Sequence, residues 1–278
     1  MKVSGRDVAE AILKKLDKEI KIKKLKPKLA IILAGNNPSS RIYVNNKIKT
    51  AKRIGIEANL FEFSEREQER CLQTIQRLNK NKSVHGIIVQ YPVYDSWNFE
   101  KFEQSINPLK DVDGFLKDSP YSGATALAVW EMLTAFSYLS GFSKTEDFLK
   151  GKNIVVLGKG KTAGGPAIKL LKEKRFKVVS VIRETKNPNQ IIKSGDVVIS
   201  ATGVKNIVNK TNLKKGAYVI GVGLGREVVN GRHKIYGDIK EDDVEKIAKL
   251  YCPTIGGIGP LTIVSLLKNV VESASRSQ

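Results

Sequence analysis

The chain has 278 residues, enough for one large or two ordinary domains, and 41% of them are hydrophobic, so a sizeable core can be buried. The formal net charge of +20 fits a nucleic acid partner or a polyanionic small ligand. No apolar run reaches the roughly 18–20 residues that span a bilayer, and the N-terminus lacks the apolar stretch of a secretory signal. We therefore expect a cytoplasmic protein that does not enter a membrane.

Cysteine and histidine are too scarce for a disulfide framework or a structural zinc site. Cys71 and Cys252 form no paired ligand spacing with His85 or His233, so we expect no bound metal. The densest lysine run, residues 18–28, alternates with Ile and Leu as a helix with a solvated face does. It contains no aromatic residue on which a base could stack, so we expect no nucleic acid partner.

The first half of the chain alternates helical and strand patterns. The pattern predicts helices at 5–20, 39–54 and 65–80, and strands at 28–34, 57–62 and 84–90. The strand at 28–34 is a continuous apolar run, which is typical of a strand buried on both faces of a parallel sheet. Strand–helix alternation implies right-handed crossovers and a parallel sheet.

The second half begins with a long apolar helix at 124–140 and a polar stretch at 141–152. A second strand–helix series follows, with strands at 153–157, 177–182, 196–200 and 217–222 and helices between them. The tail, about 260–275, is again helical. The sequence thus predicts an α/β protein of two domains with parallel sheets.

A glycine-rich turn, residues 155–166 (VVLGKGKTAGGP), follows one predicted strand and opens a helix. It matches G-x-G-x-x-G/A, a pattern that lets backbone approach a pyrophosphate and directs a helix N-terminus at it. A P-loop is excluded because the glycine required at 155 is Val155. The turn predicts a bound dinucleotide. The expected cofactor-binding residues are Gly158, Lys159, Gly160, Ala163, Gly164, Arg183 and Leu224.

The choice of dinucleotide depends on the end of the second strand of this series, which reads Arg183-Glu184. An acidic residue there holds a ribose hydroxyl of NAD, whereas an arginine holds the 2′-phosphate of NADP. With Lys159 nearby, the sequence favours NADP, and NAD remains the alternative.

The polar stretch at 141–152, which separates the two strand–helix series, sets the expected domain boundary. Residues 1–145 form the first domain, and the C-terminal helix, 260–278, packs back on it. Residues 146–259 form a Rossmann-like NAD(P)-binding domain.

Five further motifs occur in order along the chain. They are S-R-I-Y-V-N-N-K-I-K (40–49), G-I-I-V-Q-Y-P-V (86–93), P-L-K-D-V-D-G-F (108–115), G-D-I (237–239) and P-T-I-G-G-I-G-P-L-T (253–262). They are similar to S-x-x-Y-x-x-x-K-x-K, G-I/F-L/I-V-Q-L-P-L, P-x-K-D-V-D-G-F/L, G-D-V and P-V-P-G-G-V-G-P-M-T. Together they resemble the bifunctional methylenetetrahydrofolate dehydrogenase/methenyltetrahydrofolate cyclohydrolase family of the FolD type, over about residues 5–275.

The resemblance implies oxidation of 5,10-methylenetetrahydrofolate with NADP, followed by hydrolysis of the methenyl product to 10-formyltetrahydrofolate. It also implies a folate substrate, polyglutamylated forms included, a folate cleft between the domains, and a homodimer. The implied catalytic residues are Lys47, Gln90 and Asp113, and the implied substrate-binding residues are these three with Tyr43, Gly256, Gly257, Ile258, Gly259 and Pro260.

The chemistry of these residue types agrees with the resemblance. Tyr43 and Lys47 are four apart and share a helix face, where the ring can stack on the aminobenzoyl group of folate. The Asp113 carboxylate can accept from two N–H groups of a pterin. Lys47 is the candidate proton acceptor for water attack, which requires its pKa to fall by about 3 from ~10.4, in the direction of burial. Gln90 can orient Lys47 or the water.

Several positions depart from the family pattern. Lys159 and Gly160 stand where the cofactor turn has Arg and Ser, Arg183 replaces a serine, Gly123-Ala124-Thr125-Ala126 stands in place of P-C-T-P, Gly221 replaces the aspartate of V-I-D-V-G, and Ile255 replaces a proline. Because Lys159 lacks the bidentate fork of arginine, we expect Arg183 to bind the cofactor phosphate in its place.

Two other functions are compatible with the same residues. One is a different NAD(P)-dependent dehydrogenase on this fold, acting on an amino or hydroxy acid. The other is a basic nucleic-acid-binding protein, whose binding would be sensitive to salt.

Overall fold

The computed structural model describes residues 1–229 and 232–277 and divides into two compact units. The three-stranded unit comprises Ala11–Ala124 and Ile263–Gln278, and the five-stranded unit comprises Met1–Glu10 and Thr125–Thr262. Helix α5 (Ala124–Leu139) thus groups with the five-stranded unit, although the limit expected from the sequence counts it with the first domain. The domain limits near 145 and 260 stay a prediction.

The sheet of the three-stranded unit has the order β2-β1-β3, and all its strands are parallel. The strands are β1 (Lys28–Leu33), β2 (Glu57–Glu62) and β3 (Gly86–Val89), and the helices that follow them are α2 (Pro38–Arg53), the 3-10 turn η1 (Glu65–Glu67) with α3 (Gln68–Lys80), α4 (Phe99–Gln104) and the 3-10 turn η2 (Pro108–Lys110). The three predicted strands and the parallel sheet are confirmed.

The apolar runs of β1 and β3 are explained by burial on both faces of the sheet. Ile32 and Ile87 point into one core with Ile75 of α3 and Phe102 of α4. Ile31 directly precedes Ile32 in β1 and therefore points to the opposite face of the sheet. It is equally buried, so both faces are covered.

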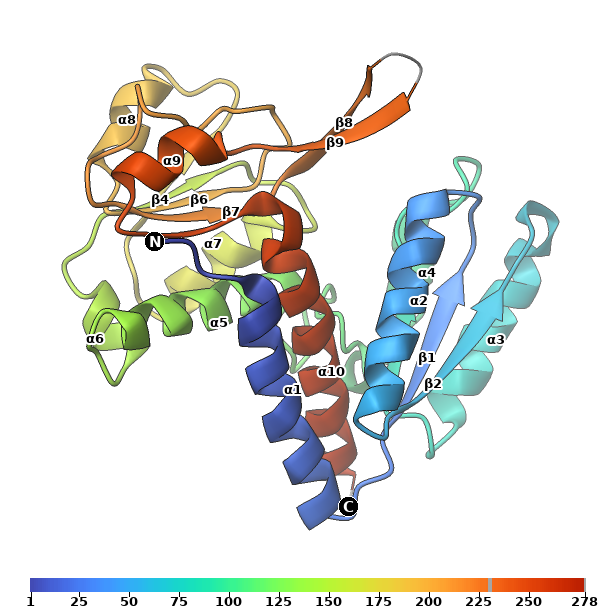
Figure 1. Ribbon diagram of the computed structural model, residues 1–278. Coiled ribbons are helices and arrows are strands. Elements are labelled where there is room, and N and C mark those ends of the chain that lie inside the picture. The colour runs from blue at the N-terminus through green and yellow to red at the C-terminus, as the bar shows by residue number, and fades with distance from the viewer. Residues whose placement is uncertain (230–231, 278) are drawn as a thin grey trace. The chain divides into compact units, whose positions relative to one another are not determined.

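The C-terminal helix α10 (Gly259–Arg276) packs back on the three-stranded unit, as predicted. Asn269 donates to the backbone carbonyls of Val112 and Ser122, at 2.9 and 3.1 Å, and the Ser273 hydroxyl donates to that of His85 at 2.6 Å. Figure 1 shows α10 beside α1 (Gly5–Ile22) along most of its length.

By length and composition, the stretch Thr254–Arg276 could cross a membrane. Of its most apolar window, however, 67% is buried inside the protein. Its apolar side chains therefore serve the core, which accounts for the composition without a bilayer.

The five-stranded unit holds a parallel sheet of order β10-β7-β6-β4-β5. Its strands are β4 (Ile154–Leu157), β5 (Val178–Val181), β6 (Val197–Ser200), β7 (Tyr218–Gly221) and β10 (Leu250–Cys252), and its other elements are α5, α6 (Thr145–Leu149), α7 (Gly164–Glu173), α8 (Pro188–Ser194), α9 (Glu241–Ile247) and the π-turn η3 (Thr254–Ile258). Because β4 lies between β5 and β6, the strand order reverses at β4. Doubly wound sheets bind ligands at such a reversal, beyond the carboxyl ends of the strands.

An antiparallel hairpin, β8 (Leu224–Val229) with β9 (Arg232–Gly237), projects from this unit in Figure 1. Neither of these strands was expected from the sequence. The described residues of β8 are exposed or half-buried, so the segment has no buried face to produce the apolar alternation on which strand prediction depends.

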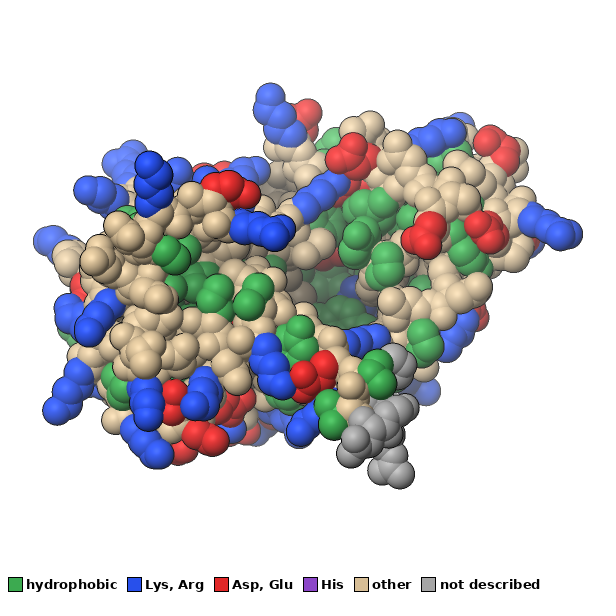
Figure 2. Space-filling view, turned by 90° about the horizontal axis from the view of Figure 1, so that it is seen from above, with side chains coloured by type: hydrophobic (Ala, Val, Ile, Leu, Met, Phe, Trp, Pro, Cys, Tyr) green, Lys and Arg blue, Asp and Glu red, His purple; other side chains and the backbone are tan. Residues whose placement is uncertain are grey.

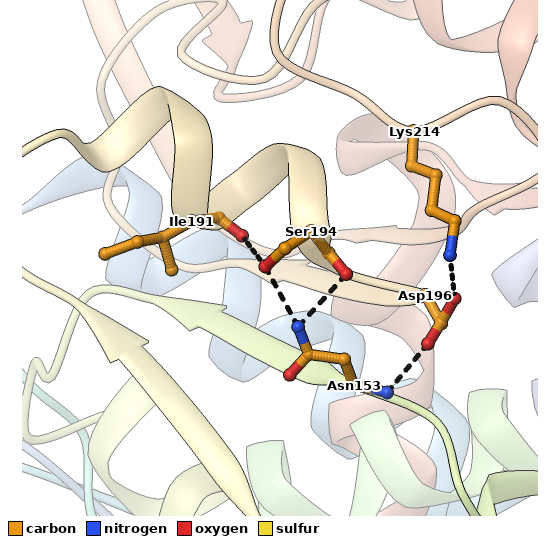
Figure 3. A network of polar contacts seen from close by, with 5 residues as sticks. All are labelled: Asn153, Ile191, Ser194, Asp196 and Lys214. Carbon is orange, nitrogen blue, oxygen red and sulfur yellow. Dashed lines mark hydrogen bonds and ion pairs between the residues drawn. The ribbon is translucent and has the colours of Figure 1, made fainter.

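The amino-terminal edge of the five-stranded sheet is tied together by side chains (Figure 3). Asp196, before β6, accepts from the Asn153 backbone N–H at 2.8 Å and from Lys214 at 2.6 Å. The Asn153 amide donates to the carbonyl oxygen and the hydroxyl of Ser194, at the end of α8. These bonds fix the starts of β4 and β6, and so the register of the strands that lead to the opposite, carboxyl edge.

Candidate functional site

Helix α2 carries two of the predicted site residues on one face. Asn37 caps the helix by accepting from the Ser39 N–H at 2.9 Å, and Pro38 occupies the first turn. One helical turn apart, the Lys47 ammonium lies 4.9 Å from the centroid of the Tyr43 ring. Lys47 is only 5% exposed, which is unusual for a lysine and indicates a role beyond solvation.

Gln90 meets Lys47 from the end of β3. Lys47 Nζ donates to Gln90 Oε1 at 3.0 Å, and Gln90 Nε2 donates to the carbonyl oxygen of Tyr91 at 2.7 Å. The Ser40 hydroxyl, also on α2, donates to the same carbonyl at 3.4 Å, just before the cis peptide bond Tyr91–Pro92. Ser40 therefore ties the Gln90 turn to α2. Ser40 belongs to the motif at 40–49, and the sequence alone suggested no role for it.

Asp113 interacts with Lys47 electrostatically. Burial lowers the pKa of Lys47, and the Asp113 carboxylate opposes that shift. Burial also raises the pKa of Asp113, and the Lys47 ammonium opposes it in turn. Both groups are thereby moved toward their neutral forms, which is the condition for exchanging protons near neutral pH.

The loop that carries Asp113 is held by Asp111, for which the sequence alone suggested no role. Asp111 is 1% exposed and accepts from the backbone N–H groups of Leu116 at 2.8 Å and Gly114 at 3.2 Å. Burial raises the pKa of Asp111 to about 6. The two aspartates of K-D-V-D-G thus differ in surroundings: the first fastens the loop, and the second is oriented by it.

The glycine-rich turn of the five-stranded unit lies beyond the carboxyl end of β4. Gly158 has φ +88°, and a Cβ there would lie 2.5 Å from the carbonyl oxygen of Ala201. A Cβ on Gly164 would lie 2.1 Å from the carbonyl oxygen of Gly158, whereas a Cβ on Gly160 would meet nothing within 4 Å. The turn is therefore closed by Gly158 and Gly164, and Gly160 leaves open space over which a pyrophosphate can lie. These residues fit a dinucleotide.

The other predicted cofactor residues surround this turn. The Gly158 N–H donates to the carbonyl oxygen of Val181 at 2.8 Å, which brings the turn beside the end of β5, two residues before Arg183. Arg183 and Lys159 are both exposed and can reach a ligand. Leu224 is 53% exposed, and its carbonyl lies against Gly203 in the loop after β6.

The predicted terminal loop of the five-stranded unit lies beyond β10. Gly256 has φ +76°, and a Cβ on Gly257 would lie 2.7 Å from Cys252 Sγ. Ile255, at the position of the family's proline, is 56% exposed. The loop can therefore present backbone to a ligand, as expected. The other predicted substrate-binding residues, Tyr43, Lys47, Gln90 and Asp113, lie in the three-stranded unit.

No group of three or more His, Cys, Asp or Glu side chains placed to hold a metal ion occurs in residues 1–229 and 232–277. Lysine and arginine side chains are spread over the whole face seen in Figure 2, with acidic side chains among them, rather than gathered in one stripe. A glycine-rich turn at a strand reversal and a buried lysine paired with a glutamine are features of an α/β enzyme that uses a dinucleotide.

Comparison with known proteins identifies the enzyme. Residues 3–113 match the catalytic domain of tetrahydrofolate dehydrogenase/cyclohydrolase, and residues 124–278 match the NAD(P)-binding domain of the same enzyme. The chain belongs to the tetrahydrofolate dehydrogenase/cyclohydrolase family. It is a bifunctional methylenetetrahydrofolate dehydrogenase and cyclohydrolase of one-carbon folate metabolism.

Individual relatives match along nearly the whole chain. Bifunctional protein FolD of Caldanaerobacter subterraneus subsp. tengcongensis is 33% identical, covering 98% of this chain and 96% of its own length. The FolD structure from Campylobacter jejuni superposes with a TM-score of 0.89 at 30% identity, over 100% of this chain and 99% of that one. FolD from Trypanosoma brucei, solved with NADP and an inhibitor, has the same TM-score and identity over 100% and 98%. The comparisons thus favour the folate enzyme over the two alternative functions.

Proposed function

We propose that Lys47 is the proton-transfer residue of the cyclohydrolase reaction and that Gln90 and Asp113 control its position and charge. The observation that supports this role is the buried hydrogen bond from Lys47 Nζ to Gln90 Oε1 at 3.0 Å. Burial lowers the pKa of Lys47, which favours the neutral amine that can accept a proton.

In the hydrolysis, water adds to the methenyl carbon between N5 and N10, and the cationic substrate loses its charge. The attacking water must give up a proton, which the neutral amine of Lys47 accepts. The hydroxyl of the resulting carbinolamine then loses its proton to solvent as the bond between the carbon and N5 breaks. The Lys47 ammonium gives its proton to N5, so that 10-formyltetrahydrofolate and one released proton are formed and Lys47 is again neutral. Gln90 directs the amine, since its own amide is held by the Tyr91 carbonyl. The Tyr43 ring offers a flat surface for the aminobenzoyl group.

In the oxidation, the bound dinucleotide supplies the hydride acceptor. The chain contributes orientation and exclusion of water rather than an acid or base. Tyr43 and Asp113 hold the folate in this proposal, and the turn closed by Gly158 and Gly164 holds the pyrophosphate. Both activities are tested together in one assay that follows reduced cofactor and methenyl product. Reduction of NADP+ without methenyl accumulation or hydrolysis would contradict the proposed pairing.

We further propose that NADP+ is the preferred dinucleotide. Arg183 follows β5, where a ribose 2′-substituent is read, and a guanidinium binds a phosphate through two N–H groups. The Arg183→Ala variant is expected to raise KM for NADP+ about tenfold or more and to leave KM for NAD+ nearly unchanged. Lys172→Ala, an exposed lysine on α7, controls for the change in surface charge. An unchanged ratio of the two KM values in Arg183→Ala would refute the assignment.

We also propose a cytoplasmic homodimer that accepts polyglutamylated folate. The net charge of +20 supports the last point, since each added glutamate contributes a carboxylate. The tests are a comparison of KM for monoglutamyl and pentaglutamyl substrate in low and high salt, and sedimentation of the purified chain. Equal KM values for the two substrates, or a monomer at micromolar concentration, would contradict these proposals.

A further inference from the structure

Asp238 is a fully buried carboxylate that the catalytic proposal does not use. It lies between β9 and α9, and its exposed fraction is 0%. Its Oδ2 accepts from the Ser200 hydroxyl at 2.8 Å and from the backbone N–H groups of Thr202 and Gly223, each at 3.1 Å. Its Oδ1 accepts from the Thr254 hydroxyl at 3.4 Å. A single side chain thus satisfies donors from three separate loops.

All three loops lie at the carboxyl edge of the five-stranded sheet. Ser200 ends β6, Gly223 lies two residues beyond β7, and Thr254 lies two residues beyond β10. Ligands of doubly wound sheets bind at this edge, and the loop after the second strand, here β5, reads the adenosine ribose. The loops after β6 and β7, on the other side of β4, therefore receive the nicotinamide half of the dinucleotide.

The backbone of the loop after β7 packs closely against Asp238. A Cβ on Gly223 would lie 2.4 Å from Asp238 Oδ2 and 2.3 Å from the backbone nitrogen of Gly203. Thr254, 4% exposed, leads directly into the Gly256–Pro260 loop, which the resemblance assigns to folate. Through Asp238, the loops for the two reactants belong to one hydrogen-bonded group.

Two departures from the family pattern meet at the same place. The family pattern has aspartate at 221 and valine at 254, and this chain has Gly221 and Thr254. A Cβ on Gly221 would lie 2.3 Å from Thr254 Oγ1. The threonine hydroxyl therefore occupies the space in which a side chain at 221 would stand, and this hydroxyl donates to Asp238.

We propose that Asp238 is a positioning residue of the dehydrogenase reaction. By accepting hydrogen bonds from both, it holds the loops after β6 and β7, which receive the nicotinamide half, in a fixed position relative to the loop that leads into Gly256–Pro260. This inference rests on the dinucleotide function proposed above. Hydride transfer requires the two carbons to approach to about 3–3.5 Å, so a displacement of one loop against the other slows the reaction even when both ligands bind. Burial raises the pKa of Asp238 to about 6, which leaves it ionised, with both oxygens free to accept, at pH 7 and above.

The test compares Asp238→Ala with Asp238→Asn. The alanine variant leaves four donors without an acceptor. In the asparagine variant, the amide oxygen can accept from Ser200, Thr202 and Gly223, and the amide nitrogen can donate to the Thr254 hydroxyl. Asp243→Ala is the matched control, because it removes another buried carboxylate of the same unit, one paired with Lys240.

Three readouts separate positioning from general damage. We expect Asp238→Ala to lower kcat of the dehydrogenase and to raise KM for NADP+, each about tenfold or more. Binding of 2′,5′-ADP, which represents the adenine half alone, and the cyclohydrolase rate should stay within about threefold of the wild type. Asp238→Asn should recover most of the dehydrogenase rate. Asp243→Ala should resemble the wild type in all three.

The outcomes are decisive in each direction. Wild-type dehydrogenase kinetics in Asp238→Ala would overturn the inference, as would an Asp238→Asn variant that is equally impaired, since the charge and not the hydrogen bonds would then matter. If the alanine variant fails to fold, Ser200→Ala takes its place, because it removes one donor and leaves the carboxylate. Ser200→Ala should lower kcat of the dehydrogenase by a smaller factor, and an unchanged kcat would contradict the inference. A wild-type chain that binds neither NADP+ nor 2′,5′-ADP would instead refute the dinucleotide function itself.

Discussion

Replacement of Lys47 by methionine tests the proposed proton transfer most directly. Methionine preserves the length and the apolar stem of the side chain but cannot accept a proton. Loss of a positioned general base typically costs a factor of about 10²–10⁴ in rate, or roughly 2.7–5.5 kcal/mol of transition-state stabilisation. We expect the cyclohydrolase rate of Lys47→Met to fall within that range.

The structure also indicates that the variant will fold. Removal of the ammonium leaves Gln90 Oε1 without the donor it has at 3.0 Å, which costs about 1–3 kcal/mol. The same change removes a positive charge from a site where only 5% of the lysine is exposed, and that removal is favourable. The two effects oppose each other, so the net change in the free energy of unfolding is expected to be small.

The assay follows the disappearance of methenyltetrahydrofolate absorbance, and a thermal shift by NADP+ reports the integrity of the five-stranded unit. Lys49→Met is the control, because Lys49 is an exposed lysine on the same helix, α2. Hydrolysis by Lys47→Met within about threefold of the wild type would refute the role of Lys47. An equal loss in Lys49→Met would show that the reaction depends on general positive charge rather than on one proton acceptor.

Three further predictions follow from local geometry and charge. Since the Asp113 carboxylate raises the pKa of Lys47, Asp113→Asn should move the lower-pH limb of the cyclohydrolase profile to lower pH; a shift to higher pH would contradict the coupling. A methyl at Gly164 would lie 2.1 Å from a backbone carbonyl oxygen, so Gly164→Ala should lose about 1–3 kcal/mol of stability in urea unfolding, whereas Gly160→Ala, with nothing within 4 Å, should not; equal losses would argue against the close contact. Because the folded pKa of Asp111 is about 6 against 3.8 for the free group, its contribution to stability is present below about pH 4 and is lost as the pH rises through 6. The stability of Asp111→Asn relative to the wild type should therefore rise by up to about 3 kcal/mol across that window, at 1.36 kcal/mol per pKa unit, and a constant difference in unfolding experiments from pH 4 to 7 would refute the assignment.

The two sheets could be predicted because several of their strands, namely β1, β3, β4, β6 and β7, are buried on both faces. Residues 29–33 of β1 and all of β4 are apolar, and short apolar runs of this kind between helical patterns indicate buried strands. The hairpin β8–β9 could not be predicted by the same logic, since its described residues have no buried face. Neither could β10, which has only three residues.

The candidate site was predicted in its residues more completely than in its connections. Lys47 and Tyr43 were expected from the resemblance to the folate enzymes, and their helical spacing agreed with it; the turn at Gly158 was expected from glycine spacing. Asp238 received no role, because its partners come from Ser200 to Thr254 along the chain and no local pattern joins them. The glycine that closes the cofactor turn, Gly164, follows the motif position assigned to Ala163, and only the three-dimensional contact distinguishes the two.

The close approach of Gly221 to Thr254 makes the backbone spacing of two strand ends a condition on the residue at 221. A Cβ on Gly221 would lie 2.3 Å from the Thr254 hydroxyl, so any side chain at 221 requires the end of β7 or the loop after β10 to move. Threonine and valine have nearly the same shape, so a valine at 254 would leave that clash in place. Whether position 221 can carry a side chain therefore depends on the distance between these two loops, and a change of residue 254 to valine would not by itself make room for one.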